Sequence, residues 1–362
     1  MSNLTPQPGI MDIALYEGGQ SHLAGVADVL KLSSNENPLG PPPSAVKALS
    51  EAAGGMHLYP STDHTSLRAA IGEVWGVDPD RVICGVGSDE VLQFVTQAFA
   101  GPGDEIIYTE HGFSMYPILT SMAGATRVCV PEHERVVDVD EILAVVTDNT
   151  RVVLLANPAN PTGTLLPQEE LQRLADGLPG HVILVIDGAY AEFAIGYDGG
   201  ISLARDRTNV LVTRTFSKLY GLGGLRIGWG FGSRDMVDVM NRIRQPFNLS
   251  VVQLAAAEAA VRDRAWLETC IALNTEQRAR LIGSLRQLGL ACDESHANFV
   301  LARAADSVEA DAAEAALNAA GILVRRVAGY GFPEGLRITV GDAEQTGRVI
   351  ETLTQWREGA VA

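Results

Sequence analysis

The sequence predicts an α/β protein with a large, mostly parallel sheet and a second, smaller α/β unit. Two patterns support this: strand-like and helical segments alternate through the middle of the chain, and long alanine-rich helical segments follow residue 250. The chain has 362 residues, a length at which a single hydrophobic core has usually stopped growing. We therefore expect a large domain over 35–255 and a small domain made of 1–34 together with 256–362.

Short β-branched runs that end in turn or polar residues are typical of strands buried in a sheet. Amphipathic segments at 88–100, 138–146 and 167–178 lie between several of these runs and predict helices. Because strands and helices alternate, we expect helices to cover both faces of the sheet. The predicted strands are 105–110, 126–131, 151–158, 181–187, 209–216 and 225–231.

The C-terminal third has a different character. Helical segments at 251–263 and 265–289 precede three strand-like runs, which are interleaved with further helices. Residues 1–34 have too little apolar periodicity to fold alone, so we expect them to fold back onto this second unit. The three strand-like runs are 298–304, 322–327 and 335–341.

The charge balance argues against several classes of partner. Asp and Glu number 44 against 27 Lys and Arg, which gives a formal net charge of -17. A field of that sign repels nucleic-acid phosphates and anionic lipid heads, so we expect neither nucleic acid nor membrane as a partner. No apolar run is long enough to cross a bilayer and no secretory leader is evident, so we expect a cytoplasmic location.

The cysteines predict neither a metal site nor a disulfide framework. Cys84, Cys129, Cys270 and Cys292 are scattered, and no pair has the CxxC spacing of a zinc site. We expect reduced thiols in the core and no metal.

Polar side chains lie at the ends of three predicted strands. Asn160 follows the run 151–158, Asp187 ends the run 181–187 with Tyr190 three residues later, and Lys218 follows 209–216. In open α/β sheets, ligands bind at the carboxyl ends of the strands. We therefore expect these groups, although far apart in sequence, to meet around one ligand.

These residue types suit pyridoxal 5'-phosphate. A lysine amine can bind this cofactor covalently, and an aspartate can pair with its protonated ring nitrogen so that the ring remains an electron sink. A tyrosine and an asparagine can hydrogen-bond the phenolic oxygen of the ring. Any of these residues alone could be an ordinary surface or turn residue, so the prediction depends on their occurring together.

The phosphate of such a cofactor needs donors and positive charge. Thr215, Ser217 and Arg226 lie close to the lysine in sequence, and the loop 85-GVGSDE-90 opens a predicted helix whose backbone N–H groups can bind an anion. The same loop departs from the dinucleotide-binding pattern because its sixth position is Glu90 and not glycine. A nicotinamide site is therefore not favoured.

The ordered motifs resemble those of the fold-type I pyridoxal-phosphate-dependent transferases. The match comprises 157-NPANPTG-163, the D-x-x-Y of Asp187 and Tyr190, and the S-K-x(7)-R that runs from Ser217 to Arg226. The chain is similar to the aminotransferase subgroup that includes histidinol-phosphate aminotransferase. The subgroup resemblance covers nearly the whole chain, through 33-SSNENPLGPPP-43, 59-YP-60, 85-GVGSDE-90 and 335-GLRITVG-341.

The resemblance implies a role for each matched residue. Lys218 would hold the cofactor and later move a proton, Asp187 would pair with the ring nitrogen, and Asn160 and Tyr190 would contact the ring oxygen. Tyr59 would reach the phosphate of the neighbouring subunit's cofactor, which makes a homodimer part of the prediction. The residues expected around the phosphate are Ser88, Asp89, Thr215, Ser217 and Arg226.

Two residues are candidates for the aromatic side chain that stacks on the cofactor ring. In the family it lies in a Pro-Thr-aromatic stretch, and the corresponding stretch here is 110-EHGFSMYP-117. We expect Phe113 in this role, with Tyr116 as the alternative.

The resemblance also implies the residues that hold an anionic substrate. Arg337 matches the arginine that binds a substrate carboxylate or phosphate, and Arg325 and Tyr16 match two further phosphate-binding positions. Asn37, in the 33–43 motif, is a further substrate-binding candidate. Arg326 is adjacent to Arg325 in a strand, so only one of the two can face the pocket.

The implied reaction moves the amino group of L-histidinol phosphate to 2-oxoglutarate. An aromatic amino acid aminotransferase and a phosphothreonine decarboxylase share this scaffold and remain alternatives. A cofactor-sensing regulatory module is a third, but it would need an attached DNA-binding domain, and only about thirty residues precede the first motif.

Overall fold

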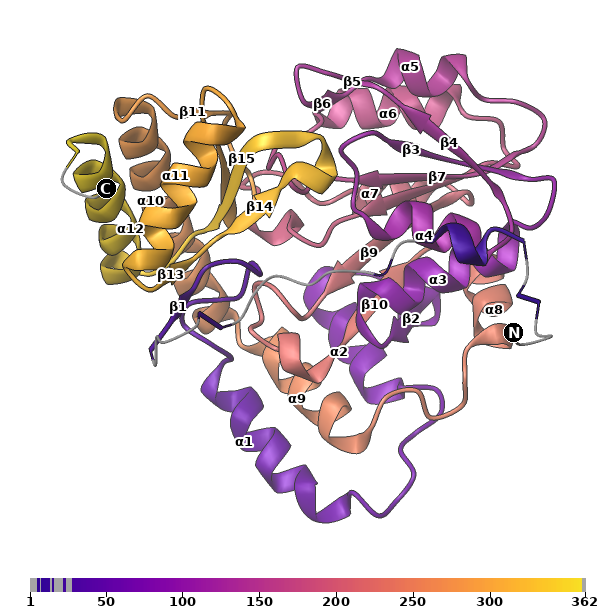
Figure 1. The fold of residues 1–362 in the computed structure, drawn as a ribbon. Coiled ribbons are helices and arrows are strands. Elements are labelled where there is room, and N and C mark those ends of the chain that lie inside the picture. The colour runs from indigo at the N-terminus through magenta and orange to yellow at the C-terminus, as the bar shows by residue number, and fades with distance from the viewer. Residues whose placement is uncertain (1–4, 7, 14, 16–21, 24–27, 360–362) are drawn as a thin grey trace.

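The fold is described from a computed structural model that covers residues 5–6, 8–13, 15, 22–23 and 28–359. Its centre is a seven-stranded sheet with the strand order β2-β10-β9-β8-β7-β3-β4 (Figure 1). The five strands from β9 to β4 are parallel, and β10 is antiparallel to both of its neighbours. The strands are β2 (Val82–Gly85), β3 (Glu105–Thr109), β4 (Thr126–Val130), β7 (Thr150–Ala156), β8 (Ile183–Asp187), β9 (Val210–Thr215) and β10 (Gly228–Phe231).

Helices cover both faces of this sheet, as the alternating sequence pattern predicts. Successive residues of a strand point to opposite faces of the sheet. Val185 and Ile186 of β8, for example, belong to two separate apolar clusters. One cluster contains α3 (Gly87–Phe99), α4 (Met115–Met122) and α8 (Arg234–Ile243). The other contains α2 (Thr65–Trp75), α5 (Val139–Ala144), α6 (Gln168–Gly177), α7 (Ile201–Asp206) and α9 (Val251–Arg262), and α1 (Pro43–Ala52) packs on α9.

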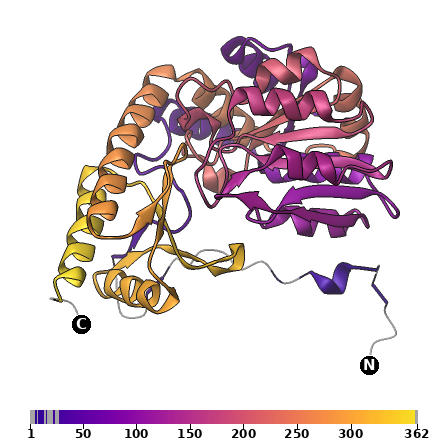
Figure 2. The same ribbon diagram turned by 90° about the horizontal axis from the view of Figure 1, so that it is seen from above.

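The second unit is built on a four-stranded antiparallel sheet with the order β11-β12-β15-β14. Figures 1 and 2 show it in orange and yellow beside the large sheet, with the helices α10, α11 and α12 packed next to it. Their apolar side chains form a third cluster with the inner face of this sheet. The elements are β11 (Ala291–Cys292), β12 (Phe299–Arg303), β14 (Arg325–Val327), β15 (Phe332–Thr339), α10 (Arg264–Gln287), α11 (Ser307–Ala319) and α12 (Ala343–Arg357).

The end of the N-terminal segment, from Leu30 to Leu32, lies against the second unit. β1 (Leu30–Lys31) pairs in parallel with β13 (Ile322–Leu323), and the Leu32 side chain lies in the apolar cluster of this unit. The 3₁₀ helix η1 (Ile10–Asp12) stands apart from the large sheet in Figure 2. The predicted domain boundary between residues 255 and 256 falls inside α9 and remains a proposal.

Several elements differ from the sequence prediction. The run 225–231 becomes a strand only from Gly228, because Gly223–Leu225 form a 3₁₀ turn. The run 322–327 divides at Val324 into two short strands that pair with different partners. β2 was not predicted, since a run of only four buried residues carries no periodicity.

Smaller elements connect the main ones. They are the hairpin strands β5 (Glu132–His133) and β6 (Val136–Val137), and the 3₁₀ turns η2 (Ala53–Gly55), η3 (Pro79–Arg81), η4 (Ala191–Phe193), η5 (Gly223–Leu225) and η6 (Ala328–Tyr330).

The four cysteines are free thiols, but one of them does not lie in the core. Cys84, Cys270 and Cys292 are buried, whereas Cys129 is exposed on β4, the edge strand of the large sheet. The prediction of four core thiols was therefore wrong for Cys129. Within the described residues, no helix is both long and apolar enough to cross a membrane, and no group of His, Cys, Asp or Glu could hold a metal ion.

Candidate active site

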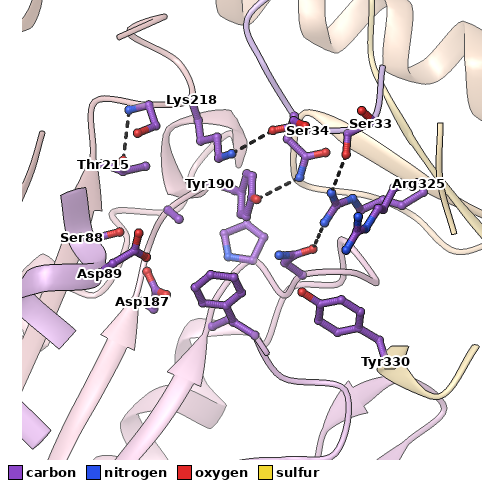
Figure 3. A pocket seen from close by; sticks show the side chains of 18 of the residues that line it. Ser33, Ser34, Ser88, Asp89, Asp187, Tyr190, Thr215, Lys218, Arg325 and Tyr330 are labelled. Carbon is purple, nitrogen blue, oxygen red and sulfur yellow. Dashed lines mark hydrogen bonds between the residues drawn. The ribbon is translucent and has the colours of Figure 1, made fainter. Parts of the chain in front are cut away.

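A cavity of about 220 Å³ lies where the two units meet, at the carboxyl ends of β7, β8 and β9 (Figure 3). Most of the residues that the sequence singled out for a cofactor line it. They are Ser88, Asp89, Phe113, Asn160, Asp187, Tyr190, Thr215, Ser217, Lys218 and Arg226. The small unit contributes Arg325, Tyr330 and Arg337, and the N-terminal segment contributes Ser33, Ser34 and Asn35.

Asp187 is the last residue of β8 and is buried. Thr213 Oγ1 donates a hydrogen bond to its Oδ1 at 2.9 Å, and Tyr116 Oη donates one to its Oδ2 at 3.1 Å. Burial raises the pKa of this carboxyl to about 6, and the two hydroxyl donors act in the opposite direction because they stabilise the charged form. A buried carboxylate that is ionised near neutral pH is suited to pairing with a cationic ring nitrogen.

A hydrogen bond orients the side chain of Tyr190, and another orients that of Asn160. Each leaves a donor group available for a ligand. Asn35 Nδ2 donates to Tyr190 Oη at 2.9 Å, so the phenol proton remains available for another acceptor. Asn160 Oδ1 accepts from Arg337 Nη1 at 2.6 Å, which leaves the Asn160 amide N–H groups for another acceptor. Burial raises the pKa of Tyr190, so its phenol remains a donor at neutral pH.

Lys218 follows β9 and its side chain reaches into the cavity (Figure 3). Its Nζ donates to the backbone carbonyl of Ser34 at 3.1 Å and lies 5.7 Å from the centre of the Tyr190 ring. Burial and the nearby charge of Arg337 lower the pKa of the Lys218 amine to about 8. At that pKa a substantial fraction of the amine is neutral near physiological pH, as a nucleophilic lysine requires.

One end of the cavity is suited to an anion. The helix α3 begins at Gly87, and Ser88 and Asp89 lie in its first turn, where backbone N–H groups have no partner within the helix. Gly87 has φ +78, a backbone conformation that favours glycine, and a Cβ there would lie 2.6 Å from Arg226 Nη2 and push the guanidinium aside. Arg226 is held by Ser217 Oγ at 2.9 Å and Asp89 Oδ2 at 3.0 Å.

The opposite end of the cavity carries two arginines on neighbouring strands. Arg325 of β14 and Arg337 of β15 are direct partners in the antiparallel register, so they lie on the same face of the sheet. The Arg337 side chain is buried, and Nη2 donates to the Ser33 carbonyl at 3.1 Å. Arg326 lies on the other face and forms an ion pair with Asp311. This placement separates the two adjacent arginines in the way that strand alternation predicts.

The two aromatic candidates lie in different environments. Phe113 lines the cavity, whereas the fully buried Tyr116 lies behind it and contacts it edge-on, with ring centres 5.9 Å apart. The position of Phe113 fits the role of a stacking aromatic. Tyr116 instead contacts Asp187, which places it beside the carboxylate.

Two predicted site residues, Asn37 and Tyr59, are not among the described residues that line the cavity. Asn37 donates to the carbonyl of Leu219 at 2.7 Å and to Cys270 Sγ, so it has a structural role, and Asn35 from the same motif lines the cavity instead. Tyr59 is 82% exposed and packs against Phe247. Tyr16 lies outside the described residues.

Sequence reasoning missed several residues of the site. Thr213 lies two residues before Thr215 on the same strand, so both side chains point to the same face, and this spacing could have identified it. Asn35 lies within a motif that was recognised, but the motif alone does not tell which asparagine faces inward. Tyr330 carries no local signal, because it reaches the cavity only through the tertiary placement of η6.

Known proteins of several organisms resemble this chain in sequence. The family model for aminotransferase class I and II matches residues 27–353. The chain belongs to the aminotransferase class I and II family. It is 64% identical over 358 residues to histidinol-phosphate aminotransferase of Ruegeria pomeroyi, covering 99% of each chain. It is also 60% identical over 354 residues to histidinol-phosphate aminotransferase of Roseobacter denitrificans, covering 98% of this chain and 99% of that one.

Two solved structures share the fold of this chain. The crystal structure of histidinol-phosphate aminotransferase from Sinorhizobium meliloti, in complex with pyridoxal 5'-phosphate, matches with a TM-score of 0.89 and 27% identity, covering 100% of this chain and 99% of that one. The aspartate aminotransferase of Thermus thermophilus with maleate matches with a TM-score of 0.79 and 24% identity, covering 91% and 92%. Because enzymes named for different substrates share this fold, the fold alone does not identify the substrate.

Proposed function

We propose that the chain transfers the amino group of L-histidinol phosphate to 2-oxoglutarate, with imidazole acetol phosphate and L-glutamate as products, in histidine biosynthesis. The observation that carries this proposal is the pair of arginines, Arg325 and Arg337, that line the same cavity as Lys218. The substrate is a phosphate ester without a carboxylate, so two guanidinium groups are suited to its anionic end. The relatives that are 64% and 60% identical are named for this activity.

The cavity fits pyridoxal 5'-phosphate. When bound, this cofactor provides an electron sink that stabilises negative charge on the substrate carbon that bears the amine. Lys218 would hold it covalently and Asp187 would pair with its ring nitrogen, while Tyr190 and Asn160 would donate to the ring oxygen and Phe113 would cover the ring. The residues that would hold its phosphate are Ser88, Thr215, Ser217 and Arg226, together with the backbone N–H of Asp89 in the first turn of α3. The Asp89 carboxylate would instead keep Arg226 in place.

Lys218 is the group that moves the proton at the substrate carbon. Its amine lies inside the cavity, close to the Tyr190 ring, and its pKa is lowered to about 8. An amine with this pKa can both accept and return a proton near neutral pH. The Ser34 carbonyl accepts a hydrogen bond from Nζ and thereby fixes the direction of the side chain.

The arginines hold both substrates in turn. Arg337 is fixed by Asn160 and by the Ser33 carbonyl, so its guanidinium is already oriented before a substrate enters. L-Histidinol phosphate and 2-oxoglutarate are both anions, and the same positive charges can therefore serve each half of the exchange. Tyr16, expected from the sequence to assist with the phosphate, remains a prediction.

We also propose that the chain forms a homodimer. Large apolar side chains are exposed along one segment, with Met56 69%, Leu58 61% and Tyr59 82% exposed, and Phe247 packs against Tyr59. Exposed apolar patches of this kind are typical of protein interfaces. In such a dimer Tyr59 would contact the cofactor phosphate of the neighbouring subunit.

The cytoplasmic location expected from the sequence remains a prediction.

Product analysis tests the proposed reaction. The purified protein, loaded with pyridoxal 5'-phosphate, is incubated with L-histidinol phosphate and 2-oxoglutarate, and L-glutamate is measured. We expect glutamate to form in proportion to the histidinol phosphate consumed, with no release of carbon dioxide. Carbon dioxide release from phosphothreonine would support the decarboxylase alternative, and glutamate formation only from phenylalanine or tyrosine would support the aromatic one.

Light scattering after size-exclusion chromatography tests the dimer. Leu58→Asp places a charge in the exposed apolar segment and is expected to yield monomers. Val308→Asp is the matched control, because Val308 is 74% exposed on α11 of the small unit, away from that segment. A wild-type monomer, or a Leu58→Asp dimer as tight as the control, would contradict this interface.

A further inference from the structure

Tyr116 lies in the segment 110–117 but, unlike Phe113 of the same segment, does not line the cavity. It lies on α4 and is fully buried. Its hydroxyl donates to Asp187 Oδ2 at 3.1 Å, while its ring contacts Phe113 edge-on at an angle of 86°. The side chain therefore contacts two residues that face the cavity without facing it itself.

The local backbone is shaped to admit this ring. A Cβ at Gly112 would lie 3.2 Å from Tyr116 Cδ2 and 2.9 Å from the Thr109 carbonyl, so a larger residue there would displace either the ring or the strand end. The Phe113 carbonyl accepts a hydrogen bond from the Tyr116 N–H at 2.8 Å. These contacts leave the phenol little freedom to turn away from Asp187.

Asp187 depends on a small number of donors. One hydroxyl serves each carboxylate oxygen, Thr213 on Oδ1 and Tyr116 on Oδ2, and the backbone N–H of Ala189 adds a third hydrogen bond. Each donor stabilises the ionised form in a site where burial favours the neutral one. The orientation of a carboxylate held at both oxygens is also fixed, because neither oxygen can rotate without losing a hydrogen bond.

We propose that Tyr116 is a positioning residue for the cofactor: its hydroxyl keeps the Asp187 carboxylate ionised and oriented toward the ring nitrogen. This inference rests on the proposed function, since it assumes that Asp187 pairs with that nitrogen. Tyr116 acts through Asp187 and does not itself touch the reacting atoms.

One charged group and two hydroxyl donors beside Asp187 determine in which direction its pKa should change when a donor is removed. Asp89 of α3 opposes ionisation of the Asp187 carboxylate, Thr213 of β9 and Tyr116 of α4 favour it, and the neutral phenol of Tyr190 lies nearby. Burial and the Asp187 charge raise the pKa of Tyr116 well above its usual range, so the phenol remains a donor throughout the working pH range. Removing its hydroxyl therefore raises the pH below which Asp187 is protonated.

The test compares Tyr116→Phe with Tyr108→Phe as the matched control. Tyr108 is a largely buried tyrosine in the same apolar cluster, but it has no contact with the cavity. Each apo-protein is titrated with pyridoxal 5'-phosphate, and the visible band of the bound cofactor is then followed from pH 5 to 9 without substrate. We expect Tyr116→Phe to weaken cofactor binding about tenfold, since a hydrogen bond to a charged acceptor is lost.

Two further readouts separate positioning from general destabilisation. The acid limb of the spectral pH profile should move to higher pH in Tyr116→Phe, and kcat should fall while KM for L-histidinol phosphate stays within about twofold. Thr213→Val removes the donor from the other oxygen and should move the acid limb in the same direction. Since Tyr→Phe removes a single oxygen atom, the near-UV dichroism of the apo-protein should show that the packing persists.

The outcomes distinguish this inference from the proposed function. A wild-type protein that binds no pyridoxal 5'-phosphate would contradict the proposed function. If the wild type binds it, but Tyr116→Phe matches Tyr108→Phe in affinity and in pH profile, the positioning role of Tyr116 is overturned, whatever the result for Thr213→Val.

Discussion

The two ends of the cavity are built in different ways. The cofactor end comes from one sheet: Asp187 and Thr215 end adjacent parallel strands, and the first turn of α3 lies beside them (Figure 3). The substrate end is assembled from separate parts of the chain, because Arg325 and Arg337 come from the small unit and Ser33 comes from the N-terminal segment. The hydrogen bond between Arg337 and Asn160 joins this end directly to a cofactor residue.

The core fixes the interactions at the cofactor end, whereas those at the substrate end depend on how the two units meet. The residues at the cofactor end are held by a mostly parallel sheet that is buried on both faces, so their positions are fixed by its packing. The substrate end depends on contacts between units, such as the Ser33 carbonyl accepting from Arg337. Substitutions at the cofactor end should therefore act on kcat, and those at the substrate end on KM.

The largest effect is expected from Lys218→Ala. Loss of the amine removes both the covalent attachment and the proton carrier, so turnover should fall to the background of the assay while far-UV circular dichroism is unchanged. Lys47→Ala is the control, because that lysine is 77% exposed on α1. Appreciable transamination by Lys218→Ala would remove Lys218 from the chemistry.

Asp187→Asn tests whether the cofactor end of the cavity acts on kcat. The amide keeps the shape of the side chain but cannot carry the negative charge that faces the ring nitrogen. We expect kcat to fall by about 10²–10³-fold, the usual scale for losing one preorganised electrostatic contact, with KM little changed. A rise in KM without loss of kcat would place Asp187 in substrate binding instead.

Arg337→Gln tests whether the substrate end of the cavity acts on KM. Removing a buried guanidinium that binds an anion should weaken L-histidinol phosphate by about 2–3 kcal/mol, which corresponds to roughly 30- to 150-fold in KM. Arg326→Gln is the matched control, since Arg326 lies in the same strand as Arg325 but pairs with Asp311 on the opposite face. Equal effects of the two substitutions would show that general charge, and not this cavity, holds the substrate.

The smallest expected effect is a pH shift that links the two ends. Burial and then Arg337 lower the pKa of Lys218 to about 8, and only the neutral amine can attach the cofactor. The rate at which the apo-protein combines with pyridoxal 5'-phosphate should therefore rise with pH through about 8. In Arg337→Gln one of the lowering causes is absent, so the midpoint should move to higher pH by less than about one unit. An unchanged midpoint would mean that the two ends are electrostatically independent.

The sequence predicted the cofactor end better than the substrate end, for a physical reason. Residues such as Asp187 and Lys218 follow recognisable strands, and the carboxyl ends of parallel strands meet at one edge, so local patterns place them together. Tyr330 and Ser34 reach the cavity only through tertiary packing, and nothing in their local sequence indicates it. Asn35 lines the cavity while Asn37 contacts Leu219 and Cys270, because the motif identifies a loop while packing decides which side chain turns inward. Likewise, β2 was missed because neighbours, and not periodicity, make its four residues a strand.

The most direct test of the central claim is a half-reaction followed in the visible spectrum. The cofactor-loaded protein is titrated separately with L-histidinol phosphate, L-phenylalanine and L-tyrosine, without a keto acid. We expect histidinol phosphate to convert the bound cofactor to its amine form at far lower concentration than the aromatic amino acids do. Equal conversion by the aromatic amino acids would contradict the role of Arg325 and Arg337 as a phosphate site and would favour an aromatic aminotransferase.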